Sequence, residues 1–496
     1  MSQPTHGQPG LPARPARLPD RGRDPQQILA ELAGFAADDP AYTEGRLWSL
    51  VYYLDEAHQD FLNQAYQAYS SANGLNPSAF KSLKRLENDI IASTLDLLHG
   101  PQDACGVLTS GGTESCLLAV KTYRDMARAQ RKVTAPEMIV PATAHVAWYK
   151  AADYFDVKLR FLPLDAQLHA DVGKLAGLIN KNTVMVLGSA PEYPHGSIDP
   201  IEAMGRITQT RGVPLHVDAC VGGFILPFMA MNGVPLPLWD YRVPGVTSMS
   251  ADLHKYGFAA KGASTITYRH HAMLKHQMFV YTEWPGGMFA SPALLGTRPG
   301  GAYAAAWAAL QYFGVAGYRE LAATTYQAFE IMKKGIESIP GLCVLGEPTG
   351  PLLAYGSSDK TLNIYAVGDQ MDAKGWQINR CQNPDGLHAM ITAQHLKVVE
   401  AYLRDLRAAV ETVRANPGLA GQGGAATYGM MAHVPLRGWV KQQVLDLFAN
   451  SYRRGAAALD VSASASSAAD AHGNRPPVPR PLLERLAAWY IAQKHR

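Results

Sequence analysis

Apolar side chains recur at three- and four-residue steps between Leu83 and Leu98, the spacing that places them on one face of a packed helix. Most of the chain from Pro25 to about Gly100 shares this pattern, which predicts helices. Farther along, short apolar runs typical of strands alternate with longer stretches typical of helices. The predicted strands cover residues 138–140, 184–187, 215–217, 246–249 and 264–268, and the predicted helices cover residues 115–131, 146–155, 172–179 and 201–211. This alternation predicts an α/β fold with a mostly parallel sheet and helices on both faces.

The pattern restarts near Gly341, where strand-like runs at 362–367 and 388–391 precede a helical stretch at 394–413. We therefore expect a smaller α+β domain after the large one. The predicted organisation is a disordered tail at 1–26, a helical segment at 27–100, a large domain at 101–340, a small domain at 341–460, and a linker with a terminal helix at 461–496. The tail is rich in Pro, Gly and Arg and lacks the apolar stretch of a secretion signal. The linker is rich in Ser and Ala at 462–474, and the last helix is expected at 481–493.

The overall composition, the net charge and the spacing of the cysteines limit the classes of function that the chain can have. The 496 residues are 47% hydrophobic and 18% charged, which is typical of a globular protein, and a net charge of +3 gives no reason to expect nucleic acid or an anionic membrane as partner. The longest uncharged run, 219–239, contains three prolines, so no stable membrane insertion is expected. The five cysteines are far apart and form no CxxC pair, which predicts neither disulfides nor a metal site and favours the cytoplasm.

A first candidate for chemistry is the sequence TSGGTES at 109–115, directly before a predicted helix. Two glycines allow a tight turn, and the helix that follows presents free N–H groups to an anion such as a phosphate. Taken alone, such a cluster is more often a simple helix cap.

Two further segments follow predicted strands. PLHVDAC (214–220) ends a strand at Asp218, and SADLHKYG (250–257) carries Lys255 in a loop bounded by glycine. The aspartate alone is more often a turn residue. A lysine in such surroundings is expected to have a lowered pKa, which suits Schiff-base chemistry.

Together these segments supply what pyridoxal 5′-phosphate (PLP) requires: a phosphate loop, a carboxylate for the pyridine nitrogen, and a lysine for the aldehyde. His145 follows another predicted strand, where its ring could stack on the pyridine. The combination predicts a PLP enzyme.

At this point the sequence resembles fold-type-I PLP enzymes of the decarboxylase-like group, and within that group the sphingosine-1-phosphate lyases of the soluble bacterial type. The matching stretches lie at 106–125, 191–200, 214–224, 245–264 and 281–310, within a similarity that runs from about residue 45 to 413. The last stretch, which contains WPGG and RPGG, distinguishes these lyases from glutamate and aromatic amino-acid decarboxylases.

The resemblance implies a role for each matching residue. Lys255 is the implied catalytic, cofactor-bearing lysine, Asp218 holds the pyridine nitrogen, and His145 stacks on the ring. The other implied cofactor contacts are Gly112, Thr113 and His254, with Gly296 and Thr297 contributed by the neighbouring subunit of a homodimer. Tyr52, Asn76 and Lys261 are the implied substrate-binding residues. Asn76 departs from the family pattern, which has histidine there.

The implied activity is cleavage of the C2–C3 bond of a phosphorylated sphingoid base, which yields a long-chain aldehyde and phosphoethanolamine. An amino-acid decarboxylase is the alternative within PLP chemistry; it needs a cation for the substrate carboxylate, and Arg298 is the one evident extra arginine. A binding module that keeps the fold without turnover is the alternative outside enzymes, and the intact Lys255 and Asp218 argue against it.

Overall fold

The computed structural model of the chain describes residues 18–433 and 437–454. Its centre is a seven-stranded sheet with the strand order β1-β7-β6-β5-β4-β2-β3. In chain order these strands are β1 (Cys105–Thr109), β2 (Glu137–Pro141), β3 (Lys158–Leu162), β4 (Thr183–Ser189), β5 (Leu215–Asp218), β6 (Val246–Ala251) and β7 (Ser264–Tyr268). Strands β6, β5, β4, β2 and β3 run parallel, whereas β7 is antiparallel to both of its neighbours. The predicted mostly parallel sheet is confirmed, with β1 and β3 as two strands beyond those predicted.

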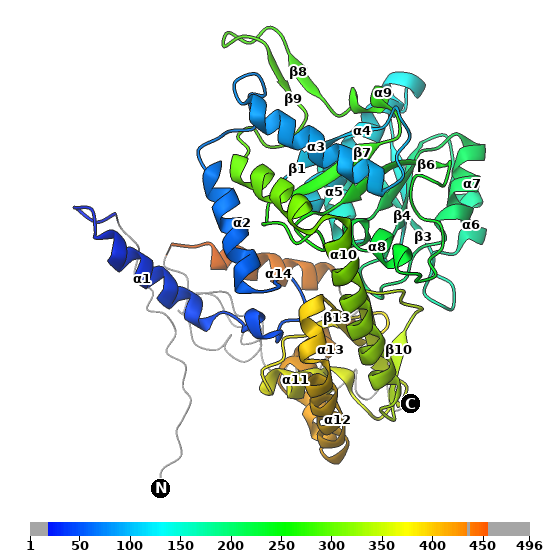
Figure 1. Cartoon of the computed structure of the whole chain (residues 1–496). Coiled ribbons are helices and arrows are strands. Elements are labelled where there is room, and N and C mark those ends of the chain that lie inside the picture. The colour runs from blue at the N-terminus through cyan, green and yellow to red at the C-terminus, as the bar shows by residue number, and fades with distance from the viewer. Residues whose placement is uncertain (1–17, 434–436, 455–496) are drawn as a thin grey trace, which may run out of the picture.

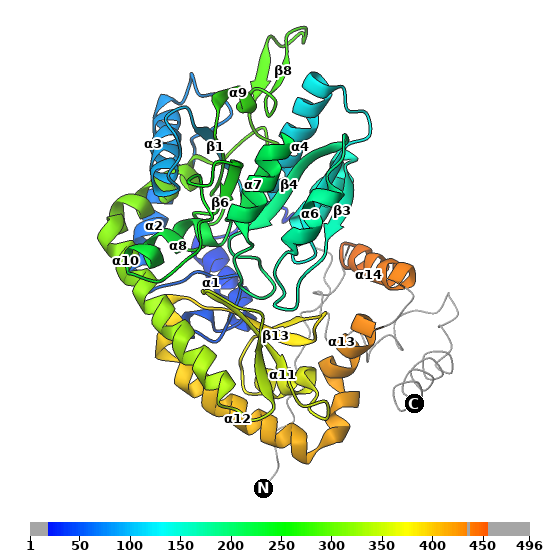
Figure 2. The ribbon, with the colours of Figure 1, turned by 90° about the vertical axis from the view of Figure 1, so that its right-hand side faces the viewer.

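Helices cover both faces of this sheet (Figures 1 and 2). They are α4 (Gly112–Arg131), α5 (Val146–Phe155), α6 (Val172–Leu178), α7 (Ile201–Arg211), α8 (Leu226–Met231) and the short α9 (His271–Leu274). Because side chains alternate along a strand, Met138 and Val140 of β2 pack in one apolar cluster with α4 and α5, while Ile139 packs in another with α7 and α8. The four predicted crossover helices are thereby confirmed as α4 to α7.

The N-terminal segment is helical, as predicted, with α1 (Pro25–Phe35), α2 (Glu56–Ala68) and α3 (Lys81–Leu97). Asp24 caps α1 by accepting hydrogen bonds from the backbone N–H groups of Gln26 and Gln27. A hairpin of β8 (Phe279–Tyr281) and β9 (Phe289–Ser291) projects from the large sheet in both views. It leads into α10 (Gly300–Glu337), which bends at Gly314 and packs against α2, α3 and α8.

Helix α10 also reaches a second sheet, which is antiparallel and has the order β10-β11-β13-β12 (Figure 1). Its strands are β10 (Leu342–Leu345), β11 (Leu352–Ser357), β12 (Asn379–Cys381) and β13 (Gly386–Met390), accompanied by helices α11 (Ile364–Ala373), α12 (Val399–Ala415), α13 (Gly423–His433) and α14 (Arg437–Ser451). The strand predicted at 388–391 is confirmed within one or two residues as β13. The predicted helix at 394–413 is divided into a 3₁₀ turn (Ala393–Lys397) and α12.

The strand predicted at 362–367 is wrong, because this segment begins helix α11. The side chain of Asn363 accepts a hydrogen bond from the N–H of Ala366 and so starts the helix, which overrides the strand preference of the apolar residues that follow. Residues 1–17 of the predicted tail, and the predictions for 462–474 and 481–493, lie outside the described residues. The domain boundaries stay a prediction. Within the described ranges, no helix is long and apolar enough to cross a membrane.

Candidate active site

The predicted chemistry gathers at the carboxyl ends of the parallel strands, where α/β folds commonly bind ligands. Asp218 ends β5, Lys255 follows β6, and His145 follows β2. Gly112 begins α4 beside them, since a Cβ placed on it would lie only 2.7 Å from Asp252 Oδ2 and 2.9 Å from Cys220 Sγ. Only glycine allows the phosphate loop to approach these side chains so closely.

Asp218 is a buried carboxylate with strong donors around it. Its Oδ2 accepts a hydrogen bond of 2.7 Å from Trp148 Nε1, and its Oδ1 accepts one of 3.0 Å from the N–H of Cys220 and one of 3.3 Å from Ser250 Oγ. Burial alone would raise the pKa of Asp218, but the bonds from Trp148 and Cys220 hold it below its ordinary value. An ionised carboxylate has about four acceptor positions, so one remains for a ligand N–H.

Lys255 is paired with a residue that had no predicted role. Its Nζ lies 2.9 Å from Asp252 Oδ2, and the Asp252 side chain is almost fully buried. Burial favours a neutral amine, yet the Asp252 carboxylate outweighs it and raises the pKa of Lys255 well above its ordinary value. The expectation of a lowered lysine pKa is therefore wrong for this arrangement. The ammonium must pass on a proton before it can form a bond to carbon.

The phosphate loop is held from behind by Glu114. One carboxylate oxygen accepts a hydrogen bond of 2.7 Å from the N–H of Ser110, and the other accepts one of 2.8 Å from the N–H of Leu294. The first N–H groups of α4 have no acceptor within the helix and are available to an anion. The His254 ring lies beside this loop, 3.6 Å from where a Cβ of Gly111 would be. Thr113 is exposed at the first turn of the helix.

His145 caps helix α5 by accepting a hydrogen bond of 3.2 Å from the N–H of Ala147 at Nδ1. This bond assigns the proton of the neutral ring to Nε2. The ring is open to solvent on one side and meets Tyr193 edge-on on another, with centroids 5.6 Å apart. Partial loss of hydration lowers the pKa of His145, which keeps the ring neutral and suited to stacking.

Lys261 and Tyr52 form the next layer outward. Lys261 Nζ donates a hydrogen bond of 2.9 Å to the carbonyl of Leu50 and lies 5.0 Å from the centre of the Tyr52 ring. Loss of hydration, with a smaller contribution from the charge of Lys255, lowers the pKa of Lys261 to about 8. Tyr52 donates to Met390 Sδ, and burial raises the pKa of its hydroxyl, so that the group stays a donor.

Three predicted site residues have no contact with Lys255: Gly296, Thr297 and Asn76. All three are exposed, and Asn73 Nδ2 donates to Thr297 Oγ1 across 3.3 Å. The Asn76 side chain accepts hydrogen bonds from the N–H groups of Ser78 and Ala79 and so stabilises a turn. The structure does not bring these residues into contact with Lys255.

Sequence reasoning missed three residues that the structure places in the site: Trp148, Tyr193 and Asp252. Two of them lie inside stretches that carried the resemblance, Tyr193 in PEYPHGSIDP and Asp252 in SADLHKYG. A carboxylate three residues before the lysine was a usable signal. The Trp148 contact had none, because it joins positions 70 residues apart.

These residues fit PLP on three counts: the open acceptor of Asp218, the glycine at the close approach of the phosphate loop, and Lys255 between them. The family profile described as "Pyridoxal-dependent decarboxylase conserved domain" matches residues 73–355. The fold is also similar to a glutamate decarboxylase from Lactobacillus brevis, with a TM-score of 0.70 at 20% identity over 82% of this chain and 95% of that one.

Two relatives are more similar in sequence. A sphingosine-1-phosphate lyase from Arabidopsis thaliana is 44% identical over 434 residues, which cover 86% of this chain and 79% of that protein. The solved sphingosine-1-phosphate lyase of Burkholderia pseudomallei is 38% identical and superposes with a TM-score of 0.79 over 87% of this chain and 97% of that one. With identity of this level over most of both chains, this chain belongs to the sphingosine-1-phosphate lyase family of PLP-dependent enzymes.

Proposed function

We propose that the protein cleaves the C2–C3 bond of phosphorylated sphingoid bases, such as sphingosine 1-phosphate, to a long-chain aldehyde and phosphoethanolamine. Family membership supports the reaction class. The observation that carries the substrate class is the position of Lys261, a second cation whose Nζ lies 3.4 Å from the backbone carbonyl of His254, the residue directly before Lys255. A short phosphorylated head with an amine at one end fits two such groups.

Bound PLP supplies an electron sink for the pair of electrons released when the carbon–carbon bond breaks. Asp218 stays ionised at neutral pH and offers its free acceptor position to the pyridine nitrogen, which favours the protonated ring. The neutral His145 ring supplies an apolar face without adding a competing charge. These residues orient the cofactor and set its charge.

Lys255 Nζ is the group placed to move protons. Its pairing with Asp252 gives the nitrogen a nearby carboxylate that stabilises the protonated form and lets it regain a proton after each transfer. We assign Lys255 Nζ, once it has passed on its own proton and is neutral, the removal of the proton from the C3 hydroxyl and the return of that proton to C2. Tyr52, whose hydroxyl remains protonated, serves as a donor to the polar head of the substrate.

The substrate phosphate is proposed to pair with Lys261, which already lies over the Tyr52 ring at the outer side of Lys255. A phosphate is a stronger partner for an ammonium than the backbone carbonyl of Leu50, which Lys261 contacts in this structure. Asn76 is assigned to the same substrate through a second subunit: its Oδ1 accepts the two hydrogen bonds of the turn, which do not use the side-chain NH2 group, and that group can donate to a phosphate oxygen.

A homodimer with shared active sites is the proposed assembly. Gly296 and Thr297 are exposed, and Thr297 is hydrogen-bonded to Asn73 of its own protomer, so the predicted cofactor contact of both residues needs another copy. Large apolar side chains are exposed on the adjoining hairpin and loop: Phe279, Val280, Tyr281, Trp284, Met288, Leu294 and Leu295. An apolar surface of this kind beside incomplete site residues favours a symmetric contact.

The amino-acid decarboxylase alternative depended on Arg298, and the structure gives this side chain another role. Arg298 is only 7% exposed, and its guanidinium donates to the carbonyl of Gly74 and to the Tyr303 hydroxyl. It thereby joins the loop before α10 to the segment at Gly74. A cation committed to these contacts does not serve a substrate carboxylate beside Lys255.

Substrate profiling tests the proposal. Purified PLP-loaded protein is incubated separately with a phosphorylated sphingoid base, the same base without phosphate, glutamate and an aromatic amino acid. We expect aldehyde from the first at a much higher kcat/KM than from the second, and no CO₂ from either amino acid. CO₂ release with no aldehyde would support the decarboxylase instead.

The proposed cytoplasmic location rests on the five cysteines, all of which are free thiols.

A further inference from the structure

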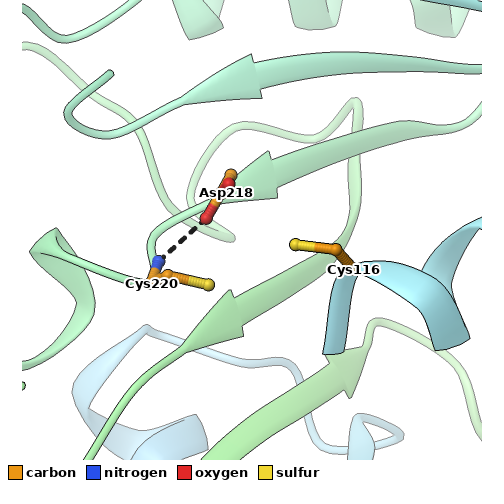
Figure 3. A group of neighbouring side chains, drawn as sticks. All are labelled: Cys116, Asp218 and Cys220. Atoms are coloured by element: carbon orange, nitrogen blue, oxygen red, sulfur yellow. Dashed lines mark hydrogen bonds between the residues drawn. The ribbon is translucent and has the colours of Figure 1, made fainter. Parts of the chain in front are cut away.

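The fold brings together two cysteines that are 104 positions apart in the sequence. Cys116, in the second turn of α4, and Cys220, just after β5, point towards each other and towards Asp218 (Figure 3). One donor atom from each of the three side chains lies within 4.8 Å of the other two, and all three residues are buried. The sequence gave no hint of this cluster, because the two cysteines are far apart in the chain and form no CxxC pair.

The donor set has the chemistry of a site for a thiophilic divalent cation. Two thiolates and a carboxylate suit Zn²⁺ or Co²⁺ and are poor ligands for Mg²⁺ or Ca²⁺. Three protein ligands leave the fourth tetrahedral position open, as zinc sites that bind water do. The third ligand, Asp218, is held in place by Trp148 and by the N–H of Cys220.

The charge of the surroundings favours a cation. Asp252 is paired with the Lys255 ammonium, but Asp218 has only neutral donors as hydrogen-bond partners among the described residues. His145 beside it is kept neutral by its lowered pKa. These neutral donors offset the cost of burying the charge of Asp218, and a cation at its remaining acceptor position adds a direct ionic contact.

A second buried oxygen is available next to the cluster. Asp252 Oδ1 has no hydrogen-bond partner among the described residues, and Asp252 is only 2% exposed. Gly112 lies between Asp252 and Cys220. A Cβ placed on Gly112 would be 3.0 Å from Asp252 Oδ1 and 2.9 Å from Cys220 Sγ. The missing Cβ leaves a polar space between the thiol and this carboxylate.

We infer that Cys116, Asp218 and Cys220 form a binding site for a thiophilic divalent cation such as Zn²⁺, and that this cation and PLP exclude each other. The exclusion follows because both need the Asp218 carboxylate, the cation as a ligand and the cofactor as the partner of its pyridine nitrogen. Binding the cation releases protons from the two thiols, since the bound forms are thiolates.

Cobalt provides a readout that does not depend on enzymatic activity. Full-length protein is stripped of PLP and titrated with Co²⁺, and the sulfur-to-cobalt charge-transfer absorption in the near ultraviolet is recorded. We expect one thiolate-ligated Co²⁺ per chain, displaced by Zn²⁺, and no such band in the PLP-loaded protein. A PLP-free protein that shows no charge-transfer band, or a PLP-loaded protein that shows the same band, would overturn the inference.

Variants locate the ligands. Cys116→Ser should lower the band to about half and weaken Co²⁺ binding at least about tenfold, because one of two thiolates is lost. The matched control is Cys105→Ser, a free cysteine outside the cluster, which should leave the band unchanged. The exposed pair His270 and His271 beside Asp103 is the competing surface site, and His271→Ala should also leave the band unchanged.

Circular dichroism verifies that each variant folds. If Cys116→Ser does not, Cys220→Ala applies the same test, since its backbone N–H to Asp218 is retained. A band that persists at full intensity in a folded Cys116→Ser or Cys220→Ala variant would show that the cation binds elsewhere and would overturn the assignment.

Discussion

Trp148 Nε1 donates a hydrogen bond of 2.7 Å to Asp218 Oδ2, and this contact connects helix α5 to the end of strand β5. Together with the hydrogen bonds from Cys220, it offsets the cost of burying the carboxylate and keeps the pKa of Asp218 below its ordinary value of 3.8. Since the charge of Asp218 is what the cofactor ring needs, the indole of Trp148 on α5 helps to set the electrostatics of the site.

Trp148→Phe is expected to weaken PLP binding about ten- to hundredfold, because a hydrogen bond to a charged group contributes roughly 1.5–3 kcal/mol. The lowered pKa of Asp218 favours the ionised form above the ordinary value of 3.8, and that contribution is lost as the pH falls through the lowered pKa. Without Trp148 this pKa rises, so cofactor loss on acidification should begin at a higher pH. Cofactor content as a function of pH, measured by absorbance, gives the result.

Trp307→Phe is the matched control. Trp307 also donates a hydrogen bond from its Nε1 to a carboxylate, Asp89 Oδ2, with a length of 3.2 Å, but this contact is not part of the candidate site. It should leave both the PLP affinity and its pH dependence unchanged. Equal effects of the two variants would show that loss of an indole, and not the contact with Asp218, is responsible.

Lys255→Ala is expected to abolish covalent attachment of the cofactor. Borohydride treatment of the wild-type protein should fix PLP to the peptide that contains Lys255, as peptide mapping by mass spectrometry would show. The variant should still bind PLP non-covalently, since Asp218 and the phosphate loop remain. Cofactor found on another lysine would contradict the assignment.

Lys261→Ala should lower kcat/KM for a phosphorylated sphingoid base about ten- to hundredfold, because it removes a charge-assisted contact that contributes roughly 1.5–3 kcal/mol. The PLP content of the variant should equal that of the wild type. Because the pKa of Lys261 is lowered to about 8, the wild-type KM should rise as the pH increases above that value and the ammonium loses its proton. Lys261→Arg should remove this dependence, since guanidinium stays charged.

Lys150→Ala is the control for Lys261, because Lys150 also lies over a tyrosine ring, with Nζ 5.3 Å from the centre of Tyr154. Its kinetics should match those of the wild type. A Lys261→Ala variant with wild-type kinetics would show that the substrate phosphate binds elsewhere or that the true substrate has none.

Trp284→Glu is expected to shift the protein from dimer to monomer, because it places a charge among the exposed apolar side chains of the hairpin. Light scattering gives the mass of the variant. Because Thr297 is proposed to complete the cofactor site of the partner subunit, the monomeric variant should also retain less PLP than the wild type. Tyr154→Glu, at a tyrosine on α5 that is at least as exposed as Trp284, should remain dimeric. A fully active species of monomer mass would refute the shared site.

The sequence predicted the sheet and most of the site because both depend on local signals. Apolar runs marked five of the seven strands, and the residues at their ends, such as Asp218 and His145, were identified by position. The amphipathic edge strand β3, with Lys158 and Arg160 among its apolar residues, lacks such a run. The helix that begins at Ile364 was misread because one capping residue, Asn363, decided it.

Long-range contacts could not be predicted in this way. The lysine pKa was expected to fall, and it rises because the carboxylate of Asp252 reaches Lys255 Nζ, a side-chain geometry that spacing alone does not determine. The meeting of Cys116 with Cys220 depends on how α4 packs against the large sheet. The roles assigned to Gly296, Thr297 and Asn76 came from the family resemblance and remain predictions.

The most direct measurement is the product stoichiometry of PLP-loaded protein with a phosphorylated sphingoid base. Mass spectrometry would quantify the long-chain aldehyde and phosphoethanolamine formed by the wild type and by Lys255→Ala. We predict equal amounts of the two products from the wild type and neither from the variant. Aldehyde without phosphoethanolamine, cleavage that persists in Lys255→Ala, or an intact substrate with fully loaded wild-type protein would contradict the account.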